Sequence, residues 1–290
     1  LYKKILAGGK SIMACWVTLD ELRPLLDNIG GDGVHLEMDF HNEREVEQAM
    51  RIIEEYQSKD DTDREVEEII RITEAQDADV SPAKKDSSLL SPSPTGRGRV
   101  GLYIVTNGRQ HDRDLIGCEA AALTTAVAIQ RLHPDLVISC GTCGGWARKG
   151  AEVGQVYIAN GAMFHDRRVP GDNAWDTQGL GNYPVWEGSY RLAEKLRMPM
   201  GKVTTGSSFD LQPIEEQYID ANGGELKEME GAAVAFVCSM YYTPVMLVKA
   251  VTNLRDAPSD DITDFHSHLK AVCQRLCEAN IDILREIQTE

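Results

Sequence analysis

The stretch ELKEMEGAAVAFVCSMYYTPVMLVKAVTNLRD, residues 225–256, contains the pattern that decides the fold of this chain. An apolar helical run begins at Glu230, and a continuous apolar strand follows at 244–253 and ends in Asn253. Buried strands alternating with helices are typical of α/β proteins, in which helices cover a largely parallel sheet. The stretch therefore predicts an α/β fold, with one polar side chain at the head of a helix and another at the end of a strand.

The alternation of strand and helix extends over most of the chain. Strands are predicted at 11–18, 100–109, 135–145, 154–166 and 201–210, and helices at 19–29, 118–134, 188–196, 230–241 and 262–287. This order favours a single three-layer domain with a central mixed, largely parallel twisted sheet flanked by helices. Sites in such sheets gather at the carboxyl ends of strands. We therefore expect the site in the loops 18–21, 141–145, 206–210 and 252–256, with GTCGG as a glycine-rich loop.

Residues 33–99 interrupt this alternation. Strongly acidic helices are predicted in their first part, and residues 77–99 are rich in Ser, Pro, Asp and Lys and poor in aromatic residues. Such a composition is typical of a mobile linker or surface loop. We expect one domain over residues 1–290 with an acidic, partly mobile insertion at about 33–99.

The composition excludes several classes of partner. A formal net charge of −16 over 290 residues opposes binding to nucleic acid. No apolar run approaches the roughly 20 residues of a membrane helix. Seven cysteines, several within apolar runs, indicate reduced thiols in a cytoplasmic protein. Cys140 and Cys143 have no second pair at zinc spacing, so no metal site is predicted.

Glu230 is the residue that points most directly to a ligand. It lies in EMEGAAVAF, beside Met229 and small apolar residues that would seat it against packed structure. An unpaired carboxylate there is costly. A sugar diol is a suitable partner, because one carboxylate can accept hydrogen bonds from two adjacent hydroxyls.

Five motifs taken together resemble one known family. VISCGTCGG, FHDRR, TTGSSFD, EMEGAAVAF and LVKAVTN are similar to the purine and uridine phosphorylase superfamily, and most of all to its plant-type methylthioadenosine nucleosidases. The resemblance covers residues 11–29 and 100–290. It implies cleavage of the N-glycosidic bond of a purine nucleoside by a homodimer, and it implies no metal or organic cofactor.

The resemblance assigns the sugar-binding part of the site. Glu230 and Met229 fall where the family binds the ribose hydroxyls and the face of the sugar. The loop that lines the ribose and the nucleophile matches Thr142, Cys143 and Gly144.

The base and the nucleophile are assigned in the same way. Phe209 falls where an aromatic ring stacks on the base, with the backbone near Asp210 addressing the base edge. Glu21 matches the glutamate that activates the attacking water in the nucleosidases. By analogy with the family, Met163, Phe164 and Trp175 are expected to help form an apolar pocket for a 5′-alkylthio group, one that can lie across a dimer interface. We interpret His165 and Asp166 as structural, because adjacent residues of a strand point to opposite faces.

The family comparison favours hydrolysis over phosphorolysis. The phosphorylases place an arginine where this chain has Ser139, and their Gly-Asp-Pro-x-Arg loop is absent here. A phosphate dianion binds poorly without arginine, so water is the favoured nucleophile, with Glu21 as general base. We expect hydrolysis of 5′-methylthioadenosine or a related purine nucleoside. A purine nucleoside phosphorylase is the alternative, and the short interval from Phe209 to Glu230 disfavours uridine.

Asn253 departs from the family pattern. The nucleosidases have an aspartate there that protonates N7 of the leaving purine, and loss of a general acid costs about 10²–10⁴ in rate. Three interpretations stay open: recognition of a 6-oxopurine, a slow or non-catalytic nucleoside-binding protein, or a substitution introduced to trap a ligand. Asp256, three residues on, is a candidate replacement proton donor.

Overall fold

The computed structural model describes residues 10–16, 35–37, 100–110, 113–171, 173–258 and 261–289, and the statements below concern these residues. The strands are β1 Lys10–Trp16, β2 His35–Glu37, β3 Val100–Thr106, β4 Arg109–Gln110, β5 Arg113–Asp114, β6 Leu136–Gly145, β7 Val156–Phe164, β8 Met200–Thr205, β9 Leu226–Glu228 and β10 Val245–Leu254. The helices are α5 Cys118–Leu132, the 3-10 helix η1 Ala147–Lys149, α6 Asn173–Leu180, α7 Gly188–Leu196, α8 Pro213–Ala221, α9 Gly231–Met240 and α10 Asp261–Thr289.

The main sheet has the strand order β10-β7-β8-β9-β6-β1-β3-β2, and β10 also pairs with β6. The pairs β1–β3, β1–β6, β6–β10, β7–β8 and β8–β9 are parallel, and β2–β3, β6–β9 and β7–β10 are antiparallel. The predicted α/β fold with a mixed, largely parallel sheet is confirmed. The strands β10, β7, β8, β9 and β6 are neighbours in this order. Because β6 also pairs with β10, this part of the sheet closes on itself, which we did not predict. The three-layer arrangement stays a prediction.

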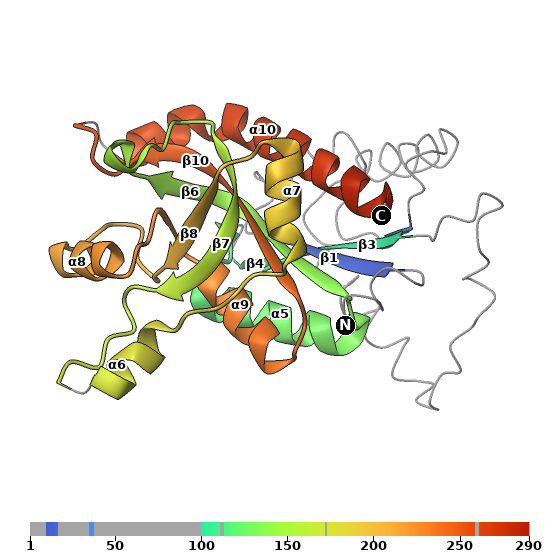
Figure 1. Ribbon diagram of the computed structural model, residues 1–290, viewed down its shortest axis with the longest axis horizontal. Coiled ribbons are helices and arrows are strands. Elements are labelled where there is room, and N and C mark those ends of the chain that lie inside the picture. The colour runs from blue at the N-terminus through green and yellow to red at the C-terminus, as the bar shows by residue number, and fades with distance from the viewer. Residues whose placement is uncertain are drawn as a thin grey trace.

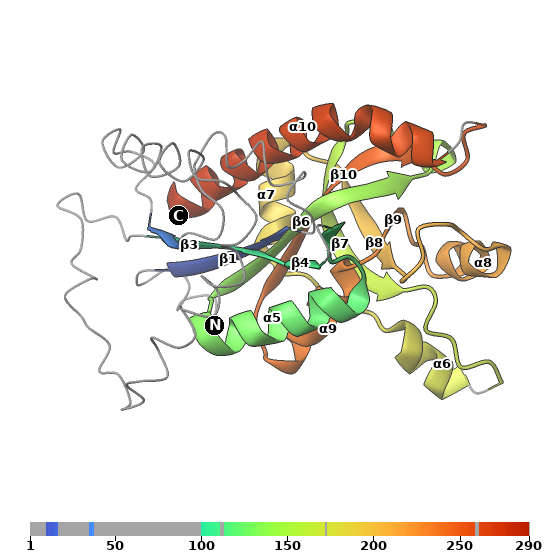
Figure 2. The ribbon, with the colours of Figure 1, turned by 180° about the vertical axis from the view of Figure 1, so that it is seen from behind.

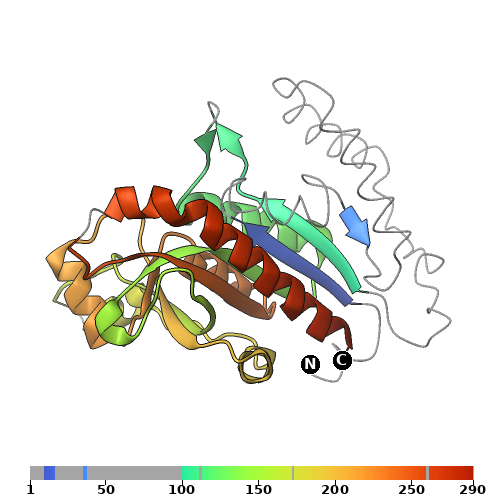
Figure 3. The same ribbon diagram turned by 90° about the horizontal axis from the view of Figure 1, so that it is seen from above.

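Helices lie on both sides of these strands. Figure 1 shows α10 along one side of the sheet, with α5 and α9 together on the opposite side. Seen from behind, β1 and β3 extend the sheet beyond β6 (Figure 2). From above, α10 extends diagonally across the molecule, roughly along the line of β1 and β3 (Figure 3). The predicted helices at 118–134, 188–196, 230–241 and 262–287 are confirmed within a few residues.

Two apolar cores follow from this arrangement. Under α10, the side chains of Leu276 and Ile283 pack with Ile138 of β6 and Val248 of β10. On the other side, small residues of α5 and α9 such as Ala128 and Ala232 pack against Val137, Leu247 and their neighbours. Small side chains let the two helices approach each other and the strands closely. None of the helices in the described ranges has the length and apolar character of a membrane span.

The GTCGG segment is strand, not the loop that we predicted. Thr142 and Cys143 pair with Ala250 and Val251 of β10, and Gly144 pairs with Asn253. A Cβ on Gly145 would lie 2.5 Å from the Ala151 Cβ, so this glycine serves close packing and not a turn. The pairing register of β10 with β6 shifts between Val251 and Asn253. A bulge of this kind changes the direction in which the neighbouring side chains point.

The two thiols of the C-x-x-C sequence cannot bind one ligand together. Cys140 lies in the core under α10 and donates to Asn280 Oδ1 at 3.0 Å, whereas Cys143 belongs to the core on the other side of the sheet. Residues three apart in a strand point to opposite faces, which explains the separation. Glu21 and the predicted helix at 19–29 lie outside the described residues, as does the insertion except for β2.

Candidate functional site

A cavity of about 250 Å³ lies where β6, β9 and β10 end. Its walls are formed by Ile116, Thr142, Cys143, Gly144, Phe209, Lys227, Glu228, Met229, Glu230, Thr252, Asn253, Arg255 and Phe265. The residues predicted for the ribose, the base and the leaving group that line this cavity are Thr142, Cys143, Gly144, Phe209, Met229, Glu230 and Asn253. Asp210 is not among the lining residues, and its carboxylate accepts a hydrogen bond from Gln212 Nε2 at 2.5 Å.

Glu230 is held at the head of α9 by the backbone around it. It is the N-cap residue of the helix, it is 5% exposed, and its Oε1 accepts a hydrogen bond from the Gly117 N–H at 2.7 Å. Gly117 has φ +96°, a conformation that L side chains rarely adopt. The carboxylate is therefore fixed at the cavity wall by two segments that are distant in sequence.

Glu228 is the residue that sets the start of α9. Its Oε2 accepts from the Gly231 N–H at 2.7 Å and from the Glu230 N–H at 3.1 Å, and its Oε1 accepts from the Thr205 hydroxyl. Lys249 Nζ pairs with the same carboxylate at 2.9 Å, and both side chains are buried. We did not predict this pair from the sequence. The lysine inside the apolar strand 244–253 was a signal for it, because a buried cation needs a partner.

The loop that bears Phe209 is fixed by Lys227. Its ammonium donates to the carbonyl oxygens of Ser208 at 2.7 Å and Phe209 at 3.1 Å. Burial lowers the pKa of Lys227 to about 8, with a further lowering from Arg255. The Phe209 ring meets Phe265 edge to face, with centroids 5.7 Å apart. Two aromatic rings and the Met229 side chain thus make this part of the wall apolar.

His165 and Asp166 support the same loop from outside the cavity. His165 Nδ1 lies 2.9 Å from the Thr204 hydroxyl, and Asp166 Oδ2 accepts from the Ser207 N–H at 2.7 Å. Burial, followed by the charges of Lys227, Arg168 and Arg255, lowers the pKa of His165 to about 3. A neutral buried histidine of this kind has a packing role.

Asn253 lies in a chain of polar contacts at the end of β10. Its Oδ1 lies 3.0 Å from the Thr252 hydroxyl, which donates, and its Nδ2 donates to Asp261 Oδ1 at 2.9 Å. The other oxygen of Asp261 pairs with Arg255 Nη1 at 2.6 Å. The Asp261 carboxylate therefore joins the amide and the guanidinium. Neither Arg255 nor Asp261 was predicted, because only the fold brings the first turn of α10 against the end of β10.

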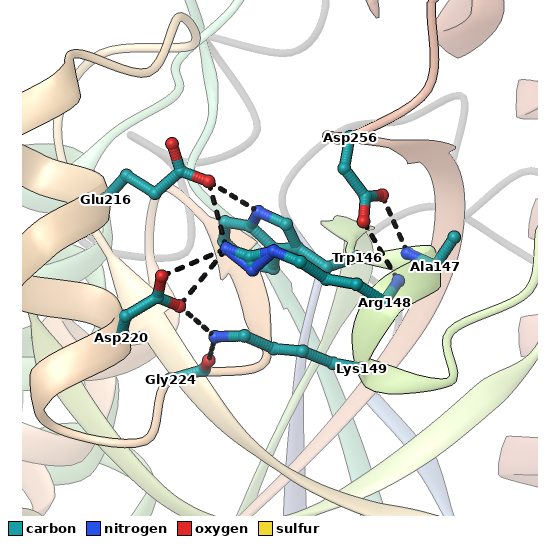
Figure 4. Close-up of polar contacts among 8 residues, drawn as sticks. All are labelled: Trp146, Ala147, Arg148, Lys149, Glu216, Asp220, Gly224 and Asp256. Atoms are coloured by element: carbon teal, nitrogen blue, oxygen red, sulfur yellow. Dashed lines mark hydrogen bonds and ion pairs between the residues drawn. The ribbon is translucent and has the colours of Figure 1, made fainter.

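Asp256 is not the replacement acid that we considered. Asp256 is not among the residues that line the cavity, and its carboxylate accepts from the backbone N–H groups of Ala147 at 2.7 Å and Arg148 at 2.9 Å (Figure 4). Burial by itself would raise the pKa of Asp256, but the hydrogen bonds from Arg148 and Ala147 outweigh it and the pKa is lowered. Asp256 is thus an ionised cap for η1.

A cluster of charges joins η1 to α8, the helix that follows the Phe209 loop. Arg148 pairs with Glu216 at 3.0 Å and with Asp220 at 3.1 Å, and Lys149 pairs with Asp220 at 2.6 Å. Glu216 also accepts from the Trp146 indole N–H at 3.2 Å (Figure 4). Each exposed pair contributes only about 0–1 kcal/mol, but together they give α8 a defined position.

The three residues that we expected around a 5′ substituent lie outside the lining of the cavity in the single chain. Met163 and Phe164 are buried, with Phe164 stacked beneath Arg167 and edge to face with Tyr183. Trp175 is 59% exposed on α6. None of the three lines the cavity of the single chain. The assignment of these three residues to a pocket for a 5′ substituent across a dimer interface stays a prediction.

Comparison with known proteins identifies the family to which the chain belongs. A family model described as the phosphorylase superfamily matches residues 66–287. The chain is 39% identical over 163 residues to a 5′-methylthioadenosine nucleosidase of Arabidopsis thaliana, across 56% of this chain and 60% of that protein. It is 37% identical over 164 residues to a 5′-methylthioadenosine/S-adenosylhomocysteine nucleosidase of the same plant, across 57% of this chain and 64% of that protein. Both matches thus span less than two thirds of the relative's length.

A solved structure extends the comparison to nearly the whole fold. The apo structure of the Arabidopsis thaliana 5′-methylthioadenosine nucleosidase superposes with a TM-score of 0.71 at 27% sequence identity. The superposition covers 97% of this chain and 96% of that chain.

Proposed function

The chain belongs to the phosphorylase superfamily, and we propose that it hydrolyses the N-glycosidic bond of 5′-methylthioadenosine or a related purine nucleoside. The products are the free base and the 5′-substituted ribose. The relatives at 39% and 37% identity are named as nucleosidases, which supports hydrolysis within a superfamily that also contains phosphorylases.

The observation that carries the proposal is the position of Glu230. A buried carboxylate at the cavity wall, with Met229 beside it and Phe209 across the same space, suits a ribose flanked by a base. One carboxylate can accept from both ribose hydroxyls. As the glycosidic bond breaks, the sugar becomes positively charged, and a fixed carboxylate stabilises that charge more than it stabilises the ground state.

The cations of the cavity support water as the nucleophile. Arg255 is paired with Asp261, and the Lys227 ammonium donates to two backbone carbonyls, so both are engaged within the protein. Ser139, which stands where the phosphorylases have an arginine, is buried in β6. We retain Glu21 as the proposed general base that removes a proton from water.

A second function, nucleoside binding without turnover, is favoured by Asn253. An amide cannot deliver the proton that a departing purine needs. The carboxylate nearest in sequence, Asp256, does not line the cavity and binds the backbone N–H groups of Ala147 and Arg148. The proposed hydrolysis is therefore expected to be slow with adenine as the leaving base.

We propose that the protein is a homodimer. Large apolar side chains are exposed on α5 and at the end of α9, namely Leu123, Val127, Met240, Tyr241 and Tyr242. Since α5 and α9 pack side by side, these residues are placed to form one patch, and such patches on a single chain mark interfaces. A cytoplasmic location stays a prediction.

The experiment is a base-release assay with 5′-methylthioadenosine, with and without phosphate. We expect release that is independent of phosphate and that falls by about 100-fold or more in Glu230→Gln, because a preorganised charge opposite the developing cation is lost. Glu278→Gln, on the exposed face of α10, is the matched control and should retain the wild-type rate. Strict dependence on phosphate would favour the phosphorylase alternative. Tight nucleoside binding with no release would favour the binding protein.

A further inference from the structure

Lys227 is a buried lysine in the strand that leads to the proposed ribose carboxylate, Glu230. It belongs to β9, it is 4% exposed, and it lines the cavity. Its backbone lies between two strands, opposite Gly144 of β6 and Thr204 of β8. The sheet therefore fixes the point from which this side chain starts.

The Lys227 ammonium binds the loop that follows β8. It donates to the carbonyl oxygen of Ser208 at 2.7 Å and to that of Phe209 at 3.1 Å. One of these carbonyls precedes the Phe209 Cα and the other follows it, so the lysine holds the backbone on both sides of this residue. Hydrogen bonds from a charged donor are about twice as strong as neutral ones. The direction of the Phe209 ring therefore depends on Lys227.

Other polar contacts hold the two ends of the same loop. The Ser207 N–H donates to Asp166 Oδ2 at 2.7 Å, and the Gln212 N–H donates to Glu215 Oε2 at 3.0 Å. Lys227 binds between these two points, at the residue whose ring lines the cavity. The lysine thus orients the centre of the loop, while the two carboxylates hold its ends.

The position of the ammonium is costly for the fold. Burial lowers the pKa of Lys227 to about 8, the charge of Arg255 lowers it further, and the carboxylates of Glu215, Glu228 and Asp210 act in the opposite direction. A buried charge is tolerated only where hydrogen bonds and counter-charges compensate it. An apolar side chain would fill the same space in β9 without this cost, so the lysine serves the loop that it binds.

We propose that Lys227 is a positioning residue for the base of the nucleoside, which holds the Phe209 loop so that the aromatic ring lies over the purine. The inference rests on the proposed nucleoside site. β9 then places both parts of the ligand, because Glu230 follows two residues after its end. Stacking on the base is made before and during bond breaking alike, so its loss weakens binding and leaves the chemical step unchanged.

The test is a double-variant cycle with Phe209, measured by calorimetry as the affinity of the full chain for adenine. Phe209→Ala should weaken binding by about tenfold or more, because stacking on the base is lost, and Lys227→Met should weaken it by a similar factor. Because Lys227 acts through Phe209, the double variant should bind adenine no more weakly than Phe209→Ala alone. A double variant weakened by the product of the two factors would overturn the proposal.

Kinetics separate positioning from a general loss of structure. With 5′-methylthioadenosine, Lys227→Met should raise KM by about tenfold and leave kcat within about threefold of the wild-type value. A loss confined to kcat would overturn the positioning role. Lys227→Arg keeps a charged donor and should restore part of the affinity. Lys202→Met is the matched control with wild-type affinity, because this lysine of β8 donates to the Asn222 carbonyl oxygen at 3.2 Å and does not line the cavity.

Two further arrangements keep the outcome decisive. If Lys227→Met does not fold, Lys227→Arg takes its place in the cycle, with the same lack of additivity expected. Base release is followed separately from adenine binding. A cycle that is not additive, in a protein that releases no base, would refute the proposed hydrolysis while supporting the role of Lys227. An additive cycle in a protein that does release the base would do the reverse.

Discussion

At the scale of single residues, Asn253 lines the cavity where we propose that the departing base binds. The Asn253 amide donates to Asp261 at 2.9 Å, and Asp261 in turn pairs with Arg255. Because an amide and a carboxylate can share a hydrogen bond without a proton change, this arrangement is satisfied while Asp261 is ionised. An aspartate at 253 would meet a second carboxylate in the same place.

We therefore expect Asn253→Asp to increase adenine release. Two carboxylates this close cannot both ionise freely, so one pKa is raised and a proton becomes available for N7. Restoring a general acid should raise the rate with 5′-methylthioadenosine by about 10²–10⁴. The measurement is kcat as a function of pH. An Asn253→Asp rate equal to that of the wild type would contradict this role for position 253. In the double variant with Asp261→Asn, the neighbouring carboxylate is gone, so the pKa of the new aspartate should be lower and activity should be lost at a lower pH.

His165 gives a pH-dependent contribution to stability. Burial holds its pKa at about 3 in the folded chain, against an ordinary value of 6.5. Between these values the unfolded chain binds more protons than the folded one, so stability is lost as the pH falls through this window. We expect the unfolding free energy of His165→Asn to fall less steeply as the pH is lowered, by about 1 kcal/mol per pH unit within this window. Urea titration at a series of pH values measures both slopes. Identical slopes in the two proteins would show that His165 does not contribute.

At the scale of elements, the start of α9 depends on a charge supplied by β10. Glu228 is the last residue of β9, and its carboxylate caps α9. Lys249 of β10 pairs with this carboxylate and neutralises its charge. The capped helix then presents Glu230 to the cavity. A sheet pairing and a helix terminus are thus coupled through one buried ion pair.

Lys249→Met is expected to destabilise the protein by about 3–5 kcal/mol, because it leaves the Glu228 carboxylate buried without its cation. The double variant with Glu228→Gln should recover much of this loss, since a neutral amide oxygen can still accept from the Gly231 N–H. Denaturant unfolding of both proteins measures the difference. A double variant as unstable as the sum of the two single variants would argue against the coupling.

At the scale of the whole molecule, an acidic chain retains an apolar surface over α5 and α9. Leu123 on α5 is 69% exposed, next to the helix whose head holds Glu230. A second copy covering this surface would stabilise the helices that form one side of the cavity.

Leu123→Glu should therefore convert the proposed homodimer to a monomer, because a charge is costly to bury at an apolar interface. Light scattering during gel filtration measures the mass directly. Ile262→Glu, at an exposed apolar residue of α10 on the other side of the sheet, is the matched control and should leave the dimer intact. A wild-type protein of monomer mass would reject the proposed homodimer.

Much of the fold and part of the site followed from the sequence alone. The period of the apolar residues predicts α5, α7, α9 and α10 and the strands that alternate with them, because burial of one helix face or of a whole strand leaves a local signature. The position of Glu230 was predictable for a similar reason: it is a carboxylate inside a run of small apolar residues. GTCGG was misjudged because glycines that serve close packing look like glycines that form a turn.

The tertiary structure alone decided what surrounds the predicted residues. Pairing of β6 with β10 brings Gly144 against Asn253 and opens space for Arg255, and the first turn of α10 supplies Asp261. In the same fold, Asp256 caps η1. Local periodicity determines which segments become strands and helices, but contacts between segments far apart in the chain depend on how those elements meet. The carboxylate proposed to bind a ribose was therefore visible in the sequence, while the polar contacts around Asn253 emerged only from the packing.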